Sequence, residues 1–432
     1  MYSRITELAP HRSAGLPQFA ALSARKHLHK VLSQFQSGAL EITEPDGSVV
    51  RLGSDAGPTY PIVINDYLTY TYMTLGGATG AGTAYILGLW SSPNLVEVVR
   101  LFVREPAITQ AVDNGFVAKL RDSAYQILEW RRRNTETGSR RNIGAHYDLG
   151  NDFFQLFLDD SMTYSAGVFP TAATTLAESQ VRKYDLICRK LDLQPGQTLV
   201  EIGSGWGGFA IHAATHYGVH VTTTTISEQQ HKMAAERIAA AGLEDRITLH
   251  FKDYRHLEGQ YDKLVSIEMI EAVGHDFFPT YMRKVASLLK PEGQALIQAI
   301  TIRDENYDRM RSGTDFIREY IFPGGHLPCV AELLRVSRAH TDLNLFDLDD
   351  FGQDYARTLH MWREAFHAHK SQVTAMGYSP EFQRMWDYYL GSCEGAFMEA
   401  SISVVHLLFT KPRCNRGPVT DRAGISTVEL PQ

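Results

Sequence analysis

Apolar and polar positions alternate in two different rhythms along the middle of the chain. Short apolar runs of the kind that form buried strands recur between residues 198 and 301, and stretches of helical spacing separate them. Strands that alternate with helices favour an α/β fold with a doubly wound, parallel sheet. The predicted strands are 198–202, 219–225, 246–251, 262–267 and 294–301, and the predicted helices between them are 208–215, 227–241 and 278–289.

The first hundred residues follow another pattern. Polar and apolar residues alternate from 39 to 43, a Pro-Asp-Gly-Ser turn occupies 45–48, and a second apolar run follows at 49–52, which together predict a β-hairpin. Residues 61–64 predict one more strand. The predicted segments are an α+β module at 1–105, a helical linker at 106–141, the α/β domain at 142–410 and a flexible tail at 411–432.

Aromatic side chains at helical spacing mark the last part of the α/β domain. They extend from Tyr355 to Phe397, after an irregular stretch at 302–355 that interrupts the alternation of strands and helices. Such a run is typical of a hydrophobic core. It is equally suited to line a site for a long apolar substrate.

A glycine-rich turn follows the first predicted strand. Residues 198–208 read Thr-Leu-Val-Glu-Ile-Gly-Ser-Gly-Trp-Gly-Gly. Glycines at such a turn let the backbone approach a ligand with its N–H groups. The pattern Gly-x-Gly-x-Gly differs from the dinucleotide fingerprint Gly-x-Gly-x-x-Gly, and a carboxylate at Glu201 suits the amino group of S-adenosylmethionine better than a pyrophosphate. The alternative is a tight strand-to-helix turn that binds nothing.

Polar side chains follow the next two predicted strands. Asp253 comes after the third strand, where it can accept a hydrogen bond from an adenine amino group. The second strand ends in the threonines 222–225, followed by Ser227, and these hydroxyl groups can contact a ribose. Ser227 is also a favourable N-cap for the next helix, which explains it equally well.

Composition and charge exclude several classes of protein. The net charge of −7 over 432 residues argues against general nucleic-acid binding. The four cysteines are far apart, which indicates neither a zinc site nor a disulfide framework, so we expect a reducing cytoplasm. The sequence has no stretch of eighteen apolar residues, so we expect no membrane-spanning helix.

Basic residues nevertheless gather in one short segment. Arginines stand at 131–133, 140 and 141, beside Trp130. This cluster is either a solvated loop between domains or a site of attraction to anionic lipid headgroups. In the second case the protein is cytoplasmic and contacts the membrane from its surface.

Several ordered motifs resemble those of the cyclopropane-fatty-acyl-phospholipid synthases and related S-adenosylmethionine-dependent lipid C-methyltransferases. The resemblance runs from about residue 40 to about residue 410. It implies a Rossmann-like methyltransferase domain, an N-terminal module that helps to engage lipid, and a homodimer. The matching motifs are 146–154, 162–165, 201–208, 225–230, 266–274, 320–328 and 351–355.

The resemblance also implies a reaction. The cis double bond of an unsaturated phospholipid acyl chain attacks the methyl group of S-adenosylmethionine, a carbocation forms, and a bound bicarbonate removes a proton as a cyclopropane ring closes. Holding a weakly nucleophilic alkene close to the sulfonium, away from water, is the physical requirement. Within this class the product can instead be a methyl or methylene branch, or the precursor of a furan ring.

Five residues correspond to the family's bicarbonate pocket. Glu271 matches the carboxylate that holds the anion, Tyr355 a hydroxyl that hydrogen-bonds to it, and Ile300 a backbone N–H donor. Ala166 and Gln298 depart from the family, which has a cysteine and a histidine there. Alanine keeps its N–H group, and glutamine can hydrogen-bond but cannot titrate near neutral pH. We expect bicarbonate to bind here. Which product the carbocation gives stays open.

The methyl-donor site carries over by motif as well. Cys393 matches a cysteine proposed as catalytic in the family, but transfer to an alkene needs no covalent enzyme intermediate, so we predict a packing thiol. The donor-binding residues implied by the resemblance are Tyr164, Ser165, Glu201, Gly203, Gly205, Thr225, Ile226, Gln230, Asp253 and Tyr254.

Two other functions stay open. A small-amine N-methyltransferase shares much of this motif set, although the N-terminal module argues against it. A non-catalytic lipid-binding protein could keep the same fold, although the intact loop at 201–208 and Glu271 argue against loss of activity.

Overall fold

The chain forms two compact units that interleave along the sequence. The computed structural model describes residues 18–113, 149–417 and 419, with 134–136, 138–139 and 142 between them. The basic cluster, the start of the 146–154 motif and most of the predicted linker and tail lie outside the described residues. The first unit contains residues 1–132, 308–323 and 362–401, and the second contains 133–307, 324–361 and 402–432.

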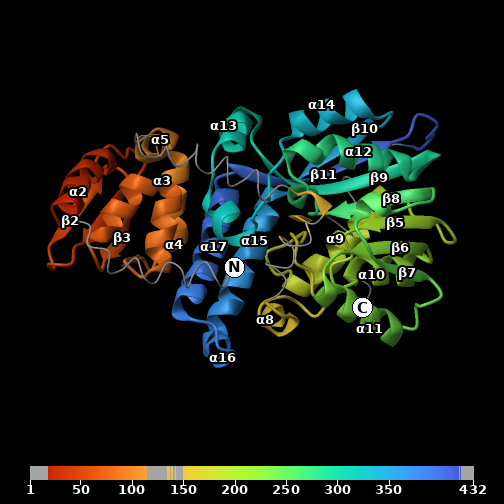
Figure 1. Ribbon diagram of the computed structural model, residues 1–432, viewed down its shortest axis with the longest axis horizontal. Helices are drawn as coiled ribbons and strands as arrows, with labels where there is room; N and C mark the ends of the chain where they lie inside the picture. The colour runs from red at the N-terminus through yellow and green to blue at the C-terminus, as the bar shows by residue number, and fades with distance from the viewer. Residues whose placement is uncertain are drawn as a thin grey trace. The chain divides into compact units, whose positions relative to one another are not determined.

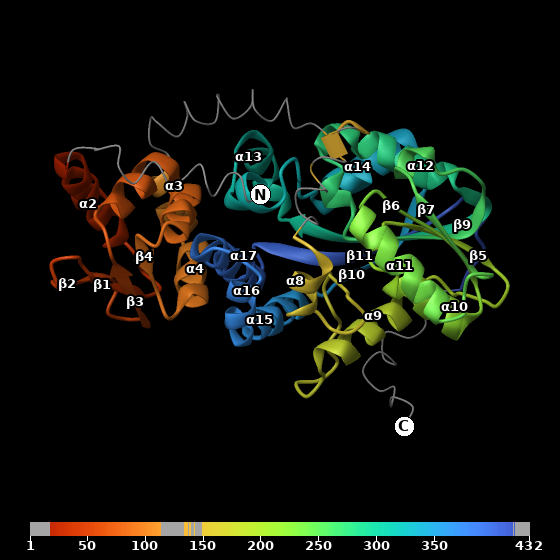
Figure 2. The ribbon, with the colours of Figure 1, turned by 60° about the horizontal axis from the view of Figure 1, so that its bottom comes forward.

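This division differs from the predicted segments. Residues 308–323 and 362–401, which we expected within the α/β domain, belong to the N-terminal unit. The reason lies in helix α17 (Pro380–Met398), which packs against α4 (Leu95–Arg104) and α3 (Leu68–Ile86) (Figure 2). A methyl group on Gly395 of α17 would lie 3.1 Å from the carbonyl oxygen of Val96, tighter than an ordinary van der Waals contact, so glycine favours this close approach.

A four-stranded sheet forms the other part of the first unit, in the order β2-β1-β3-β4. The predicted hairpin is β1 and β2, which pair antiparallel, whereas β3 runs parallel to β1. Helix α3 contains several glycines and kinks at one of them, Gly77 (φ 57°). The elements are α2 (Gln18–Leu32), β1 (Ala39–Thr43), β2 (Val49–Gly53), β3 (Thr59–Ile64), β4 (Trp90–Ser91), α5 (Pro106–Asp113), the π-helix Ile317–Ile321 and α16 (Lys370–Ala375).

The second unit is a Rossmann-like α/β fold built on a seven-stranded sheet, in the order β10-β11-β9-β8-β5-β6-β7 (Figure 1). The five predicted strands are present and parallel. The sheet is mixed rather than all parallel, because β11 is inserted antiparallel between β9 and β10. The strands are β5 (Thr198–Ile202), β6 (His220–Thr225), β7 (Ile247–Phe251), β8 (Tyr261–Ile267), β9 (Leu289–Ile302), β10 (Asn344–Asp350) and β11 (Ile402–Thr410).

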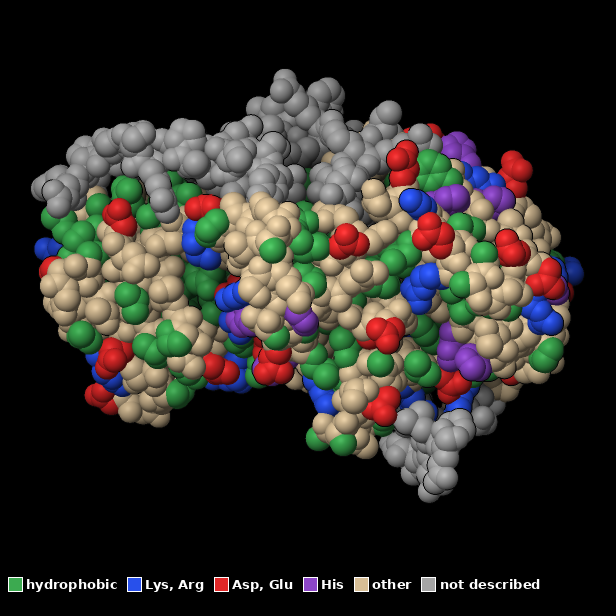
Figure 3. Space-filling view, turned by 90° about the horizontal axis from the view of Figure 1, so that it is seen from below, with side chains coloured by type: hydrophobic (Ala, Val, Ile, Leu, Met, Phe, Trp, Pro, Cys, Tyr) green, Lys and Arg blue, Asp and Glu red, His purple; other side chains and the backbone are tan. Residues whose placement is uncertain are grey.

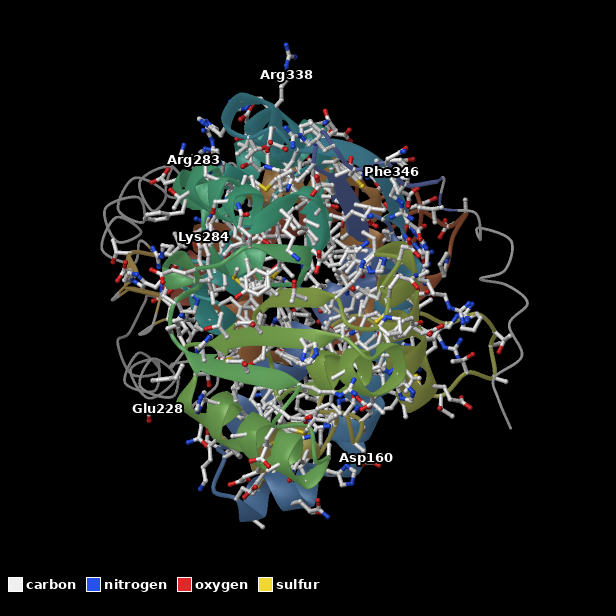
Figure 4. All side chains as sticks on the ribbon, turned by 90° about the vertical axis from the view of Figure 1, so that its right-hand side faces the viewer. Asp160, Glu228, Arg283, Lys284, Arg338 and Phe346 are labelled. Atoms are coloured by element: carbon white, nitrogen blue, oxygen red, sulfur yellow. The ribbon has the colours of Figure 1, made fainter. Side chains whose placement is uncertain are left out.

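Helices cover both faces of this sheet, as a doubly wound fold requires. Alternate strand residues face different cores: Leu199 of β5 packs with α9 and α10, whereas Val200 packs with α12 and α14. Arg283 and Arg338 lie on the outer sides of α12 and α14 (Figure 4). The helices are α8 (Asn151–Gln155), α9 (Leu176–Lys190), α10 (Gly208–Tyr217), α11 (Glu228–Ala240), α12 (Phe278–Ser287), α14 (Val330–His340) and the first part of α15 (Gly352–Ala368), with α13 (Tyr307–Ser312) starting at the boundary with the first unit.

Charges of both signs lie close together on the surface. Figure 3 shows acidic and basic side chains interspersed on the face that it draws. Along α14, for example, Arg335 pairs with Glu332 at 2.6 Å. Among the described residues, no helix is long and apolar enough to cross a bilayer.

Candidate active site

The glycine loop after β5 takes its shape from hydrogen bonds to the neighbouring strand. The N–H groups of Gly203 and Ser204 donate to the carbonyl oxygen of Thr224, at 3.2 and 2.9 Å. Gly203 has φ 95° and Gly205 has φ 49°, a region that favours glycine. A methyl group on Gly205 would meet no heavy atom of the described residues within 4 Å. The loop thus borders open space at the carboxyl end of β5, where ligands bind in such sheets.

Glu201 lies near the end of β5 and is buried. Its Oε2 accepts a hydrogen bond from Oγ1 of Thr223 on β6, at 2.6 Å. Burial raises the pKa of Glu201 to about 7, and the hydrogen bond from Thr223 opposes that shift. A carboxyl that titrates near neutral pH can become ionised beside a cationic ligand. Contact with the amino group of S-adenosylmethionine stays a prediction.

The predicted ribose contacts come together at the end of β6. Oγ1 of Thr225 donates to Oε1 of Gln230 at 2.9 Å, and it accepts from the N–H of Ser227 at 3.1 Å. Ser227 caps α11, because its hydroxyl accepts from the N–H of Gln230 at 3.3 Å. Ile226 lies between them and is half-buried. Ser227 therefore has the structural role that we had left as an alternative.

Asp253 has a different environment from the one that we expected. Its two carboxylate oxygens accept from Nε and Nη2 of Arg255, each at 2.8 Å. Burial raises the pKa of Asp253, but the hydrogen bonds and charge of Arg255 outweigh burial, and the net pKa is lowered. The neighbouring Tyr254 has a buried hydroxyl with no partner among the described residues. That hydroxyl, unlike the carboxylate of Asp253, is not already used by a protein group.

Glu268 is the hub of a second cluster, just after β8. Its Oε1 accepts from the N–H of Ala166 at 2.9 Å and from Nε2 of Gln298 at 2.7 Å. Its Oε2 accepts from the hydroxyl of Tyr355, at the start of α15, at 2.8 Å. The structure thus brings together Ala166, Gln298 and Tyr355, three of the predicted pocket residues, around a carboxylate that we had not predicted as part of the site.

A buried lysine lies close to this cluster. Nζ of Lys183, on α9, donates to Oγ of Ser165 at 2.5 Å. Burial lowers the pKa of Lys183 to about 7, and the negative charge of Glu268 opposes that shift. Burial raises the pKa of Glu268, opposed first by Lys183 and then by the donors. The adjacent Tyr164 packs its ring against Phe154, with centroids 5.3 Å apart.

Glu271 supplies a second buried carboxyl on the 3-10 turn Ile270–Ala272. Its Oε1 accepts from the N–H of Ile300 on β9 at 2.5 Å. Its Oε2 is buried and has no hydrogen-bond partner among the described residues. Burial, and secondly the charge of Glu268, raise the pKa of Glu271 to about 8. At neutral pH Glu271 is therefore mostly protonated, and its free oxygen can take part in proton transfer.

These contacts do not fit the expected bicarbonate. The donors assigned to the anion are the N–H groups of Ala166 and Ile300, the amide of Gln298 and the hydroxyl of Tyr355, and each already binds a protein carboxylate. The carboxylate of Glu268 would also repel a further anion. This arrangement therefore does not fit the predicted bicarbonate. The donor residues, by contrast, fit S-adenosylmethionine, since open space borders the glycine loop.

Cys393 lies on α17 and belongs to the first unit, whereas the other predicted site residues belong to the second. Burial raises the pKa of its thiol to about 12, and the charge of Asp315 adds to that shift. A thiol with so high a pKa supplies almost no thiolate near neutral pH. The environment therefore favours the predicted packing role over a nucleophilic one.

Sequence reasoning missed Glu268, Lys183 and His406 as members of the site. Glu268 stands within the 266–274 motif, where a second carboxylate follows an apolar strand, and this was a usable signal. Lys183 is one of several basic residues on an amphipathic helix, and nothing in its spacing shows that it is buried. His406 pairs across the sheet with Gln298, a register that depends on the unpredicted strand β11.

Comparisons with known proteins agree on one kind of enzyme. The family model described as mycolic acid cyclopropane synthetase matches residues 134–407. Tuberculostearic acid methyltransferase UfaA1 of Mycobacterium tuberculosis is 37% identical over 76% of this chain and 78% of its own. Cyclopropane-fatty-acyl-phospholipid synthase of Escherichia coli is 36% identical over 78% of this chain and 84% of its own. The solved mycolic acid cyclopropane synthase CmaA1, complexed with SAH and CTAB, is 32% identical with TM-score 0.59, covering 63% of this chain and 98% of that one.

Proposed function

The chain belongs to the mycolic acid cyclopropane synthetase family and is an S-adenosylmethionine-dependent methyltransferase, and on this premise we propose that its substrate is the cis double bond of an unsaturated phospholipid acyl chain. Two relatives that match most of the chain are named for a fatty acid and for a fatty acyl phospholipid, which supports a one-carbon transfer to lipid. The observation that carries the proposal is the buried cluster around Glu268, which places two carboxyl groups, those of Glu268 and Glu271, beyond the end of β8.

When bound, the methyl donor supplies an electrophilic methyl group attached to a sulfonium. The residues of this chain then have two tasks. The loop at Gly203 and Gly205, with Thr225 and Gln230, holds the donor at the carboxyl edge of the sheet. A carboxylate beyond β8 accepts the proton that the alkylated chain must lose. Since this carboxylate is buried, water is kept from a carbocation that it would otherwise trap.

We propose a cyclopropane acyl chain as the product. A methyl or methylene branch, or a furan precursor, is the second candidate. Two observations favour this second candidate. The relative that is 37% identical is named for tuberculostearic acid rather than for a cyclopropane. Gln298 and Ala166 differ from the family's pattern, and both donate a hydrogen bond to the carboxylate of Glu268.

We further propose that the enzyme acts at the membrane surface, as a homodimer, with the N-terminal unit engaging lipid. The family resemblance supports all three points. Arginines 131–133, 140 and 141 would attract anionic headgroups, each contributing about 1 kcal/mol near such a surface. Replacing the first three with glutamine should weaken binding to anionic vesicles in a salt-dependent way. Unchanged binding to these vesicles would instead support the alternative that the arginines belong to a solvated loop.

Transfer of label tests the proposed function. The protein is incubated with methyl-labelled S-adenosylmethionine and vesicles of monounsaturated or fully saturated phosphatidylcholine and phosphatidylglycerol. We expect label in the acyl chains of the monounsaturated lipid only. Label in neither lipid, with the vesicles still bound, would instead support a non-catalytic lipid-binding protein. Label in an added small amine would support the N-methyltransferase.

A further inference from the structure

The carboxylate of Glu268 occupies the centre of the site that the resemblance assigns to a free anion. Its three donors come from separate parts of the second unit: the segment before α9, strand β9 and the start of α15. Both of its oxygens are used. An anion-binding arrangement is therefore present in the fold, and the chain itself provides the anion.

The backbone holds Glu268 in an unusual conformation to achieve this. Its φ is 47°, in the left-handed region that non-glycine residues rarely adopt. Its N–H donates to the carbonyl oxygen of Gln298 at 2.9 Å, which fixes the chain just beyond the end of β8. Strain of this kind persists where the surrounding structure enforces it and tends to occur at functional sites. A glycine would adopt the same backbone without strain and would leave the three donors without their carboxylate.

Of the two buried carboxyls, Glu268 has the surroundings that better stabilise an ionised form, and Glu271 has those that favour a protonated one. Glu268 receives three hydrogen bonds and lies in the field of Lys183, whereas Glu271 receives one and keeps a buried, unpartnered oxygen. When two nearby carboxyls share one environment, the better-solvated one ionises first. Glu268 is thus the carboxylate of the pair and Glu271 the carboxylic acid.

We propose that Glu268 is the general base of the reaction and that this enzyme works without bicarbonate. This inference rests on the proposed function. The alkene π electrons form the new carbon–carbon bond as the carbon–sulfur bond breaks, leaving neutral S-adenosylhomocysteine and a cationic acyl chain. A carboxylate oxygen of Glu268 then takes a proton from that chain, and the C–H electron pair closes the ring or forms a double bond. Glu268 ends as a carboxylic acid and returns its proton to solvent.

Glu268→Gln and Glu268→Gly separate the parts of the proposal. Glutamine keeps the shape but cannot accept the proton, so turnover should fall by roughly 100-fold or more. Glycine opens the anion position, so added bicarbonate or formate should restore turnover in a saturable way. Wild-type turnover should be the same in carbon-dioxide-depleted buffer and after bicarbonate is added. Glu236→Gln, at an exposed position on α11, is the matched control and should behave as wild type.

Binding of carbon-13 bicarbonate, followed by NMR, gives a readout that does not depend on turnover. We expect binding to Glu268→Gly and none to the wild-type protein. Bicarbonate that binds the wild-type protein as well as the glycine variant, wild-type turnover that disappears on depletion, or full turnover of Glu268→Gln would each overturn the inference. A wild-type protein that methylates no lipid would contradict the proposed function, and the binding comparison would still decide whether Glu268 fills the anion position.

Discussion

His406 determines which end of the Gln298 amide faces Glu268. Nε2 of the imidazole lies 2.9 Å from Oε1 of Gln298, on the neighbouring strand. Burial, and secondly the charges of Lys190 and Lys183, hold the pKa of His406 well below its usual value, so the ring is neutral. Because Oε1 can only accept, Nε2 carries the ring proton. The amide NH₂ group is therefore left to donate to Glu268.

Replacing His406 should lower turnover by way of Gln298. His406→Phe keeps a ring but removes the donor, which frees the amide to turn. We expect a loss of roughly tenfold in kcat, the equivalent of about one hydrogen bond, with unchanged affinity for S-adenosylmethionine. His406→Gln, which can still donate to Oε1, should recover most of the rate. If both variants lost activity together with thermal stability, His406 would be a packing residue only.

The raised pKa of Glu271 predicts a dependence of stability on pH. Folding lifts this pKa from an ordinary 4.5 to about 8, so the folded protein binds the proton more tightly than the unfolded chain. Stability from this group is complete below pH 4.5 and is lost as pH rises through about 8. Glu271→Gln removes the titration and should therefore gain stability relative to wild type as pH rises.

Denaturant unfolding at about pH 5, 7 and 9 checks this expectation. Each unit of pKa shift corresponds to on the order of 1.4 kcal/mol, so the difference between variant and wild type should grow by several kcal/mol at most. Glu236→Gln, which changes an exposed carboxyl, should give no such trend. A difference that is the same at all three pH values would contradict a buried, protonated Glu271.

Gly205 and Gly242 form a matched pair for testing the donor site. Both have positive φ, 49° and 65°, and a methyl group on either meets no heavy atom of the described residues within 4 Å. Replacing either glycine with alanine should lower the free energy of unfolding by about 1 kcal/mol through backbone strain. Only Gly205→Ala should also weaken binding of S-adenosylmethionine, by roughly tenfold or more, because its methyl group enters the space beside the loop. Equal affinities by calorimetry would place the donor elsewhere.

Cys393 should be dispensable for catalysis. Its thiol pKa of about 12 leaves almost no thiolate at neutral pH. Cys393→Ala should therefore keep a turnover close to wild type and lose only some thermal stability, in line with the removal of a half-buried side chain. A loss of kcat of about 100-fold, without a change in melting temperature, would give the thiol a direct chemical role.

Periodicity was enough to predict the strands β5 to β9, although β6 consists largely of threonine and no α-helix separates β7 from β8. It did not predict β10, whose acidic residues at Asp347, Asp349 and Asp350 are typical of a loop. It also missed β11, an apolar run that follows a long helical region. That second omission hid the register between His406 and Gln298, since a partner across a sheet cannot be read without the strand that carries it.

The candidate site was predictable in its parts and not in its connections. The motifs named Tyr355 and Gln298, which the structure brings together on Glu268, but they did not mark Glu268 itself as part of the site. Ala166 and Gln298 were read as departures that weaken an anion site. The structure shows that both positions donate to Glu268, the first through its backbone N–H group and the second through its side-chain amide. These contacts become visible only when distances are known.

Mass spectrometry of the lipid product decides most directly whether the enzyme adds one carbon to an acyl double bond. Trideuteromethyl S-adenosylmethionine and monounsaturated phospholipid vesicles are supplied in carbon-dioxide-depleted buffer. We predict an acyl chain heavier by one CD₂ group, with the double bond lost and the product resistant to hydrogenation, as a cyclopropane requires. A CD₂ product that takes up hydrogen would be a methylene branch, and retention of all the deuterium would mean that the proton leaves from the chain. An unlabelled acyl chain, with the methyl donor unconsumed, would contradict the proposed function.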